Sequence, residues 1–151
     1  MKSILRTTAT YWQLPLRLCL FFVFWMHGAQ KALGMYDGPG LQGFVGYLAG
    51  TGVPAVFAYL AVFSEFLGAF GMLFGFLTRI AAFGLMCNMA FASVAMHAKW
   101  GFFMNWSGDP ARGHGYEYSM TLFFMALALF IGGAGNLSID RMIASKQKQP
   151  G

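Results

Sequence analysis

The feature that most constrains this chain is a series of long apolar segments separated by short connections. They cover residues 12–34, 54–77, 80–98 and 116–133. Each has about the 20 residues that a helix needs to cross the hydrocarbon core of a bilayer. Only 10% of the residues are charged and 58% are hydrophobic, whereas about a quarter of a soluble domain is charged. The sequence predicts an all-α membrane protein, with residues 1–151 forming one integral membrane domain of four transmembrane helices.

A fifth apolar stretch separates the first two segments. The sequence GLQGFVGYLAGTGVP at residues 40–54 is too short and too rich in glycine to span a bilayer. We therefore expect a short interfacial or re-entrant segment between the first and second transmembrane helices.

The first segment shares some features with a cleaved signal peptide. It follows the basic residues Lys2 and Arg6 and is strongly apolar. However, Arg17 lies inside it, the apolar run continues past Trp25, and no A-x-A cleavage site follows. These differences favour a helix that is retained in the protein over a signal peptide.

The distribution of basic residues predicts the orientation, because Lys and Arg resist translocation. With four spans, both termini and the connection near residue 78 share one side. Seven basic residues lie on that side: Lys2, Arg6, Arg17, Arg79, Arg141, Lys146 and Lys148. Only three lie on the other: Lys31, Lys99 and Arg112. We expect a protein of the bacterial cytoplasmic membrane with both termini cytoplasmic. The net charge of +5 then suits contact with anionic lipid heads and does not indicate nucleic-acid binding.

Glu65 is the most informative residue of the second segment. It lies about 16 Å along that helix, near the bilayer midplane, and Asn88 lies at a similar depth on the third. A carboxylate at this depth is costly and normally faces other helices, a cavity or a partner. Two interpretations remain open: a functional group, or a structural carboxylate that joins two helices through Arg or Lys.

Further polar residues gather in the outer half of the predicted bundle. His27 and Lys31 are one turn apart on the first helix, His97 ends the third, and Glu117 begins the fourth. We expect His27, Glu65, His97 and Glu117 to line one polar-rimmed cavity that opens outward. The alternative is that each bonds a backbone carbonyl or a lipid head, with Lys31 extending to the membrane surface.

The cysteines exclude a disulfide-exchanging enzyme. Cys19 and Cys87 are single, lie in different helices and form no C-x-x-C motif. We expect them to be buried packing residues. The sequence also contains no metal-binding signature, no glycine-rich phosphate loop and no catalytic-triad pattern.

Several motifs, in order, resemble the DoxX family. They are HGAQKALG, GFVGYLAGTGVP, SEFLGAFGMLFGFLTRIAA and GGAGNLSIDR, and the resemblance extends from about Arg17 to Arg141. It implies a four-helix membrane protein. It also implies a link to quinones, because the family's namesake is similar to the membrane subunit of a thiosulfate:quinone oxidoreductase. The family's G-x-x-K falls on Gly28 and Lys31, its acid on Glu65, and its T-R on Thr78 and Arg79.

Three classes of function fit these observations. In a quinone-linked oxidoreductase subunit, Glu65, His27 or Glu117 would relay protons, and the cofactor would contact Lys31, Asn88, His97 and Trp25. In a non-enzymatic membrane anchor, the chain would stabilise a partner subunit or form a homo-oligomer. In a haem or copper protein, histidine and methionine would be ligands, although we predict no metal. A fold resemblance does not decide among them.

Overall fold

The structure is a computed structural model that describes residues 4–146, and its regular elements are all helical. The α-helices are α1 (Gln13–Leu33), α2 (Gly40–Gly50), α3 (Ala55–Phe74), α4 (Thr78–Phe91), α5 (Glu117–Gly132) and α6 (Ile139–Lys146). A π-helical segment, η1 (Ala92–His97), and a 3₁₀ turn, η2 (Ala98–Trp100), continue α4. No strand occurs in these residues. The all-α prediction is confirmed.

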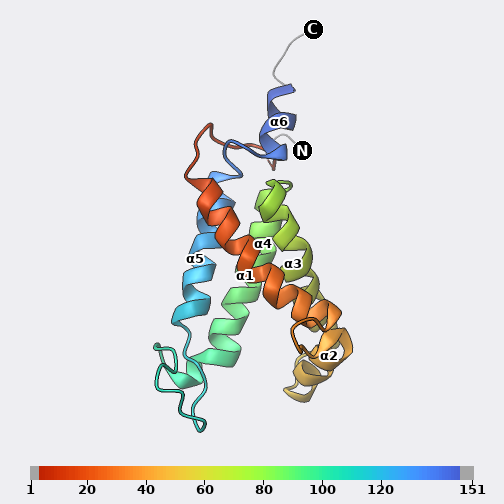
Figure 1. Cartoon of the computed structure of the whole chain (residues 1–151), viewed down its shortest axis with the longest axis vertical. Helices are drawn as coiled ribbons and strands as arrows, with labels where there is room; N and C mark the ends of the chain where they lie inside the picture. Colours follow the sequence, from red (N-terminus) through yellow and green to blue (C-terminus); the bar gives the residue numbers. More distant parts are fainter. Residues whose placement is uncertain (1–3, 147–151) are drawn as a thin grey trace.

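Helices α3, α4 and α5 run roughly along the long axis of the molecule, and α1 crosses them obliquely (Figure 1). We call the end that carries α6 and the residues before α1 the α6 end. The opposite end, which carries α2 and the loop between η2 and α5, is the α2 end. Each predicted apolar segment overlaps one of α1, α3, α4 and α5, and α2 forms in the predicted interfacial segment. Helix α4, which was expected to begin at residue 80, begins two residues earlier, at Thr78.

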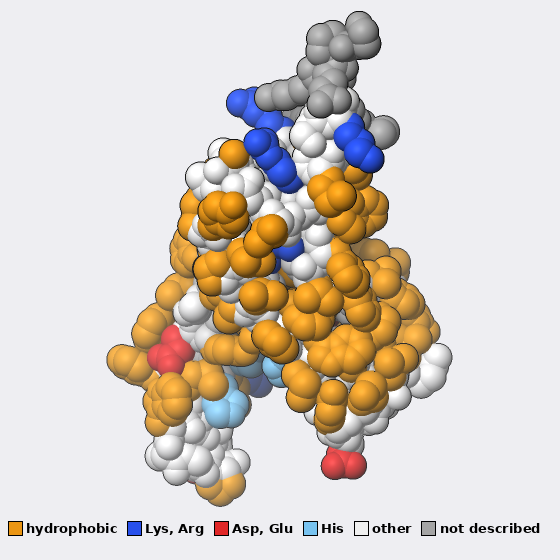
Figure 2. All heavy atoms as spheres, turned by 45° about the horizontal axis from the view of Figure 1, so that its top comes forward, with side chains coloured by type: hydrophobic (Ala, Val, Ile, Leu, Met, Phe, Trp, Pro, Cys, Tyr) orange, Lys and Arg blue, Asp and Glu red, His pale blue; other side chains and the backbone are white. Residues whose placement is uncertain are grey.

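Apolar side chains cover the outside of the bundle as well as its core. The buried core includes Leu20, Phe24, Met72, Leu85 and Leu129. Large apolar side chains on the outer faces form the orange surface in Figure 2. A helix that is apolar on all faces is characteristic of large protein cores and membrane spans. Two helices, Ala55–Phe74 and the continuous Thr78–Trp100, are long and apolar enough to cross a membrane, and α5 is a shorter apolar helix.

Glycines allow two close helix contacts. A Cβ atom at Gly28 of α1 would lie 2.8 Å from the Phe66 Cα of α3. A Cβ atom at Gly71 would lie 2.9 Å from the Ala81 Cβ of α4. Real Cβ atoms do not approach other atoms this closely, so only glycine fits at these crossings, as in membrane helix interfaces.

Arg17 occupies the buried centre of the α6 end, with 1% of its surface exposed. Its guanidinium donates four hydrogen bonds, of 2.8–3.1 Å, to the backbone carbonyls of Met72, Leu73, Ala134 and Leu137. The first two carbonyls belong to the last turn of α3, which lacks intrahelical partners for them. Arg17 therefore joins α1 to the end of α3 and to the chain that follows α5.

Helix α6 was not predicted by the sequence analysis. Its start is capped by Ser138, whose Oγ accepts from the Arg141 backbone N–H at 3.2 Å. Asp140, 1% exposed, accepts from the backbone N–H groups of Leu77 and Thr78 at 2.8 and 2.9 Å. A carboxylate at the N-terminus of α4 is electrostatically favourable. Asp140 thus fixes α6 against the connection between α3 and α4.

Replacing Arg17 tests this arrangement. Arg17→Leu removes the donor from two buried and two partly buried hydrogen bonds to carbonyls. We therefore expect the melting temperature in detergent to fall by about 10 °C. Arg141→Leu removes the same charge from α6, where the side chain makes no hydrogen bond to any of residues 4–146. It should shift the melting temperature by no more than about 2 °C. Equal melting temperatures for the two variants would contradict the role assigned to Arg17.

Candidate functional site

A pocket of about 1220 Å³ opens between the helices toward the α2 end. Figure 2 shows the surface hollowed between two lobes there, with histidine side chains beside the hollow. Its wall is mainly apolar, with contributions from α1 to α5 and η1, including Phe44, Val53, Phe57, Leu60, Met89 and Met96. Its polar lining groups include His27, Lys31, Tyr47, Ser64, Glu65, Asn88, His97, His114, Tyr118 and Ser119.

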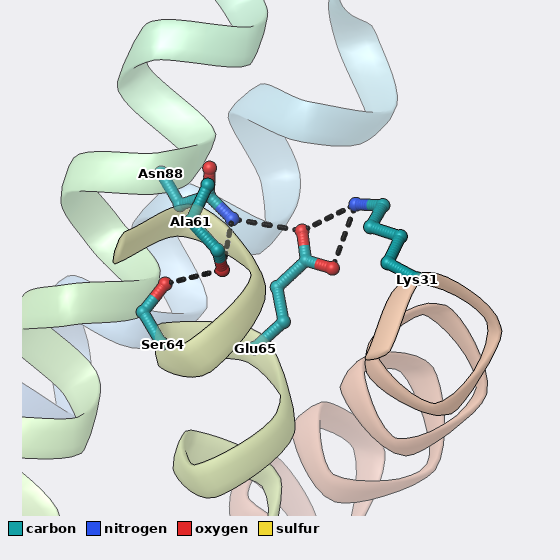
Figure 3. A network of polar contacts seen from close by, with 5 residues as sticks. All are labelled: Lys31, Ala61, Ser64, Glu65 and Asn88. Atoms are coloured by element: carbon teal, nitrogen blue, oxygen red, sulfur yellow. Dashed lines mark hydrogen bonds and ion pairs between the residues drawn. The ribbon is translucent and has the colours of Figure 1, made fainter. Parts of the chain in front are cut away.

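An ion pair with a third partner lines this pocket (Figure 3). The Lys31 Nζ donates to both carboxylate oxygens of Glu65 at 2.7 Å. The Asn88 side-chain amide donates to the Glu65 Oε1 at 2.8 Å. The Glu65 side chain is 2% exposed and that of Lys31 is 20% exposed. A buried carboxylate is tolerated when it is paired and hydrogen-bonded in this way.

The local sequence explains why these groups meet. Gly28 lets α1 approach the backbone of α3 beside Glu65. Lys31 is four residues beyond His27 and therefore shares its face of α1. The Lys31 ammonium also lies 4.9 Å from the centroid of the Phe44 ring of α2, within the range of a cation–π contact. Lys31 thus points into the bundle and does not extend to the membrane surface.

Two histidines lie on the opposite side of the pocket from α1. The Nδ1 atom of His97 is 3.0 Å from the His114 backbone oxygen, and the Asn105 backbone N–H donates to the His114 Nδ1 at 3.2 Å. Both rings line the pocket, as does the exposed ring of His27. The structure therefore brings His27, Glu65 and His97 to one cavity. The roles assigned to them remain predictions.

Glu117 and Trp25 are not among the residues that line this pocket. On α5 the lining residues are Tyr118, Ser119 and Leu122, and the helical turn of about 100° per residue directs Glu117 to the other face. Trp25 instead packs on Phe66 and Phe70 of α3, with ring centroids 5.9 and 5.4 Å apart. The prediction that Glu117 shares the cavity is wrong because the rotation of α5 could not be read from its depth.

Apart from His97, the sequence analysis missed the wall that η1 and the start of α5 contribute to the pocket. The wider π turn at Ala92–His97 brings Met96 and His97 to the pocket, and such turns are frequent at functional sites. The Ser93 and Ser119 hydroxyls bond at 2.7 Å and join η1 to α5. The serines were visible in the sequence as polar residues in apolar helices, but nothing there indicated a π turn.

The cysteines differ from the prediction. Cys19 and Cys87 are both unpaired, as expected, but both are exposed and not buried. Cys87 precedes Asn88 and lines the pocket. Within residues 4–146, no group of three or more His, Cys, Asp or Glu side chains is placed to hold a metal ion.

These features define a small helical protein of membrane-like composition with an ion pair at an apolar pocket. The family model described as DoxX matches residues 12–98, more than half of the chain. The chain therefore belongs to the DoxX family, which is membrane-associated. The match includes Lys31, Glu65, Asn88 and His97 and ends before α5. No curated protein and no solved structure matches the chain.

A double-mutant cycle tests the ion pair. Lys31→Met leaves the buried Glu65 carboxylate unpaired, at a cost of about 3–5 kcal/mol. The double variant Lys31→Met/Glu65→Gln removes both charges, so we expect it to regain most of the lost melting temperature. Thermal unfolding of the two single variants and the double variant in one detergent measures the coupling. Additive losses would show that the two side chains do not interact.

Proposed function

We propose that this chain is the quinone-binding membrane subunit of an oxidoreductase of the bacterial cytoplasmic membrane. It would be a bundle of four transmembrane helices, α1, α3, the continuous α4–η2 helix and α5, with α2 at the outer interface. The pocket beside the Lys31–Glu65 pair is the observation that carries the proposal.

The membrane arrangement is supported by the apolar outer surface and by the separation of charge. Basic side chains gather at the α6 end in Figure 2. Arg6 and Arg79 line a cavity there, Arg17 bonds two carbonyls in the segment before α6, and Arg141 and Lys146 belong to α6 itself (Figure 1). Lys2 and Lys148, which were counted on the same side, lie outside the described residues. The positive-inside rule makes the α6 end cytoplasmic. The pocket then faces the outer half of the bilayer.

The pocket has the size and chemistry that a quinone needs. Its volume of about 1220 Å³ exceeds the roughly 300–1,000 Å³ of typical small-ligand sites, which leaves room for a head group and part of an isoprenoid tail. A bound quinone would accept two electrons and two protons. Its carbonyl oxygens need hydrogen-bond donors, and its ring needs apolar contacts of the kind that Phe57, Leu60 and Met89 provide.

The polar residues divide these tasks. Lys31 and Asn88 hold the Glu65 carboxylate in place at the apolar slot. His27 and His97 line the same pocket, and a ring N–H of an imidazole can donate a hydrogen bond to a quinone oxygen. Glu65 and His27 are the proton-carrying groups of the proposal, with His97 as a further contact to the ligand. Glu117 has no place in it. Electrons would come from a partner protein.

A non-enzymatic membrane anchor is the second candidate. The observation in its favour is that Glu65 is already satisfied by Lys31 and Asn88, which is what a purely structural carboxylate requires. In that case the pocket would hold no redox cofactor after purification.

Quinone content tests the proposal. Ala61 lines the pocket on α3, and Ala61→Phe should lower the quinone extracted per protein by about tenfold through overpacking. Ala95→Phe is the matched control, since Ala95 is exposed and lies outside the pocket. The amount of quinone extracted per protein from this variant should equal that from the wild type. Mass spectrometry of solvent extracts from monodisperse protein gives the measurement. Wild-type protein without quinone that also fails to bind an added short-chain quinone would favour the anchor.

Cysteine labelling tests the topology. In a variant with Cys19 and Cys87 replaced by alanine, a cysteine at the exposed Ala111 should react with an impermeant maleimide in cells whose outer permeability barrier is opened. A cysteine at the exposed Ser145 of α6 should react only after lysis. The reverse pattern would invert the orientation.

A further inference from the structure

A second cavity, of about 630 Å³, lies at the α6 end and shares one lining residue, Phe83, with the pocket described above. It is formed by the segment before α1, the first turns of α4 and the last turn of α5. One part of its lining is basic and polar, with Arg6, Arg79 and the threonines at 7 and 8. The other part is apolar.

Arg79 is held rigidly in this cavity. Its guanidinium donates to the carbonyls of Arg6 at 3.1 Å and Ile131 at 2.8 Å, and also to that of Phe130. These contacts cap the C-terminus of α5, where a positive charge is favourable. A guanidinium has five N–H groups, so two remain for another acceptor.

The positive charges of the cavity have no acidic partner among residues 4–146. The single ion pair in that range joins Lys31 and Glu65 at the other end of the molecule. Asp140, the acidic residue of the α6 end, accepts from the backbone of Leu77 and Thr78. Arg6 is exposed. Two guanidinium groups beside one cavity form a site for an anion such as phosphate.

The apolar part of the lining decides what kind of phosphate fits. Ile80, Phe83 and Ile131 are 52%, 52% and 67% exposed and lie beside the basic groups on α4 and α5. A free phosphate ion uses no such surface, whereas an acyl chain does. The cavity therefore offers a basic surface for the phosphate of a phospholipid and an apolar surface for its acyl chain.

We propose that this cavity binds one anionic phospholipid of the cytoplasmic leaflet. The phosphate lies between Arg6 and Arg79, and an acyl chain follows Ile80, Phe83 and Ile131. This inference depends on the membrane arrangement given above but not on the quinone. Its test leaves the quinone content of the protein unchanged, so the two proposals can fail separately.

The full chain in detergent is titrated with phosphatidylglycerol, with phosphatidylcholine of the same acyl chains, and with inorganic phosphate. We expect only phosphatidylglycerol to raise the melting temperature and to remain bound in native mass spectrometry. Arg6→Gln keeps the backbone carbonyl that Arg79 uses and should weaken binding about fivefold, the effect of one basic group at an anionic lipid surface. Arg141→Gln changes a residue at the same end but outside the cavity, so it should leave phosphatidylglycerol binding unchanged.

Ile131→Ser separates a lipid from a free anion. The exposed Ile131 side chain contributes only to the acyl contact, and the substitution keeps the backbone carbonyl that Arg79 uses. It should therefore weaken phosphatidylglycerol binding while both arginines remain in place. The proposal is overturned if phosphatidylcholine binds equally well, if inorganic phosphate competes with the lipid, or if Arg6→Gln behaves as Arg141→Gln does.

Discussion

The contact between α1 and α3 is the interaction on which the rest of the structure depends. These helices meet at three heights: Arg17 bonds the carbonyls of Met72 and Leu73, Gly28 touches the Phe66 backbone, and Lys31 pairs with Glu65. The close contact at Gly28 permits the other two. Arg17 and Lys31 can reach their partners on α3 only because the backbones of α1 and α3 lie close together. Charged groups in an apolar medium must find partners within the protein. The two charged contacts therefore fix the register of the helices at both ends.

The two buried polar clusters follow the same physics but have different surroundings. The guanidinium of Arg17 donates to four carbonyls and is enclosed by the ends of α3 and α5. Glu65 is equally buried, yet its network borders a pocket large enough for a ligand. Partners that satisfy a charge completely explain a structural role. Glu65 also lines an apolar cavity, where a bound ligand could contact it. Arg17 lines no such cavity, which is why the proposed function rests on Glu65 and not on Arg17.

The sequence predicted what depends on length and depth, and missed what depends on rotation and local capping. Apolar runs of sufficient length predicted helices at the observed positions, and the depth of Glu65 predicted that it faces other helices. Depth does not specify the direction of a side chain around its helix, so Glu117 was placed in the pocket and Cys87 in the core. Helix α6 depends on the Ser138 cap, a signal that was present but not used. The π turn of η1 had no signal, because it arises from how α4 packs near α5.

The family match divides the pocket into two parts. Residues 12–98 contain the whole Lys31–Glu65–Asn88 network and His97. The remaining wall, with His114, Tyr118, Ser119 and Leu122, follows that range. The ion pair can form from α1 and α3 alone, whereas the shape of the cavity on its far side requires α5 and the loop before it. Changes after residue 98 would therefore alter which molecule fits the pocket while leaving the charged groups beneath it in place. The charged network and the far wall of the pocket are thus carried by different segments of the chain.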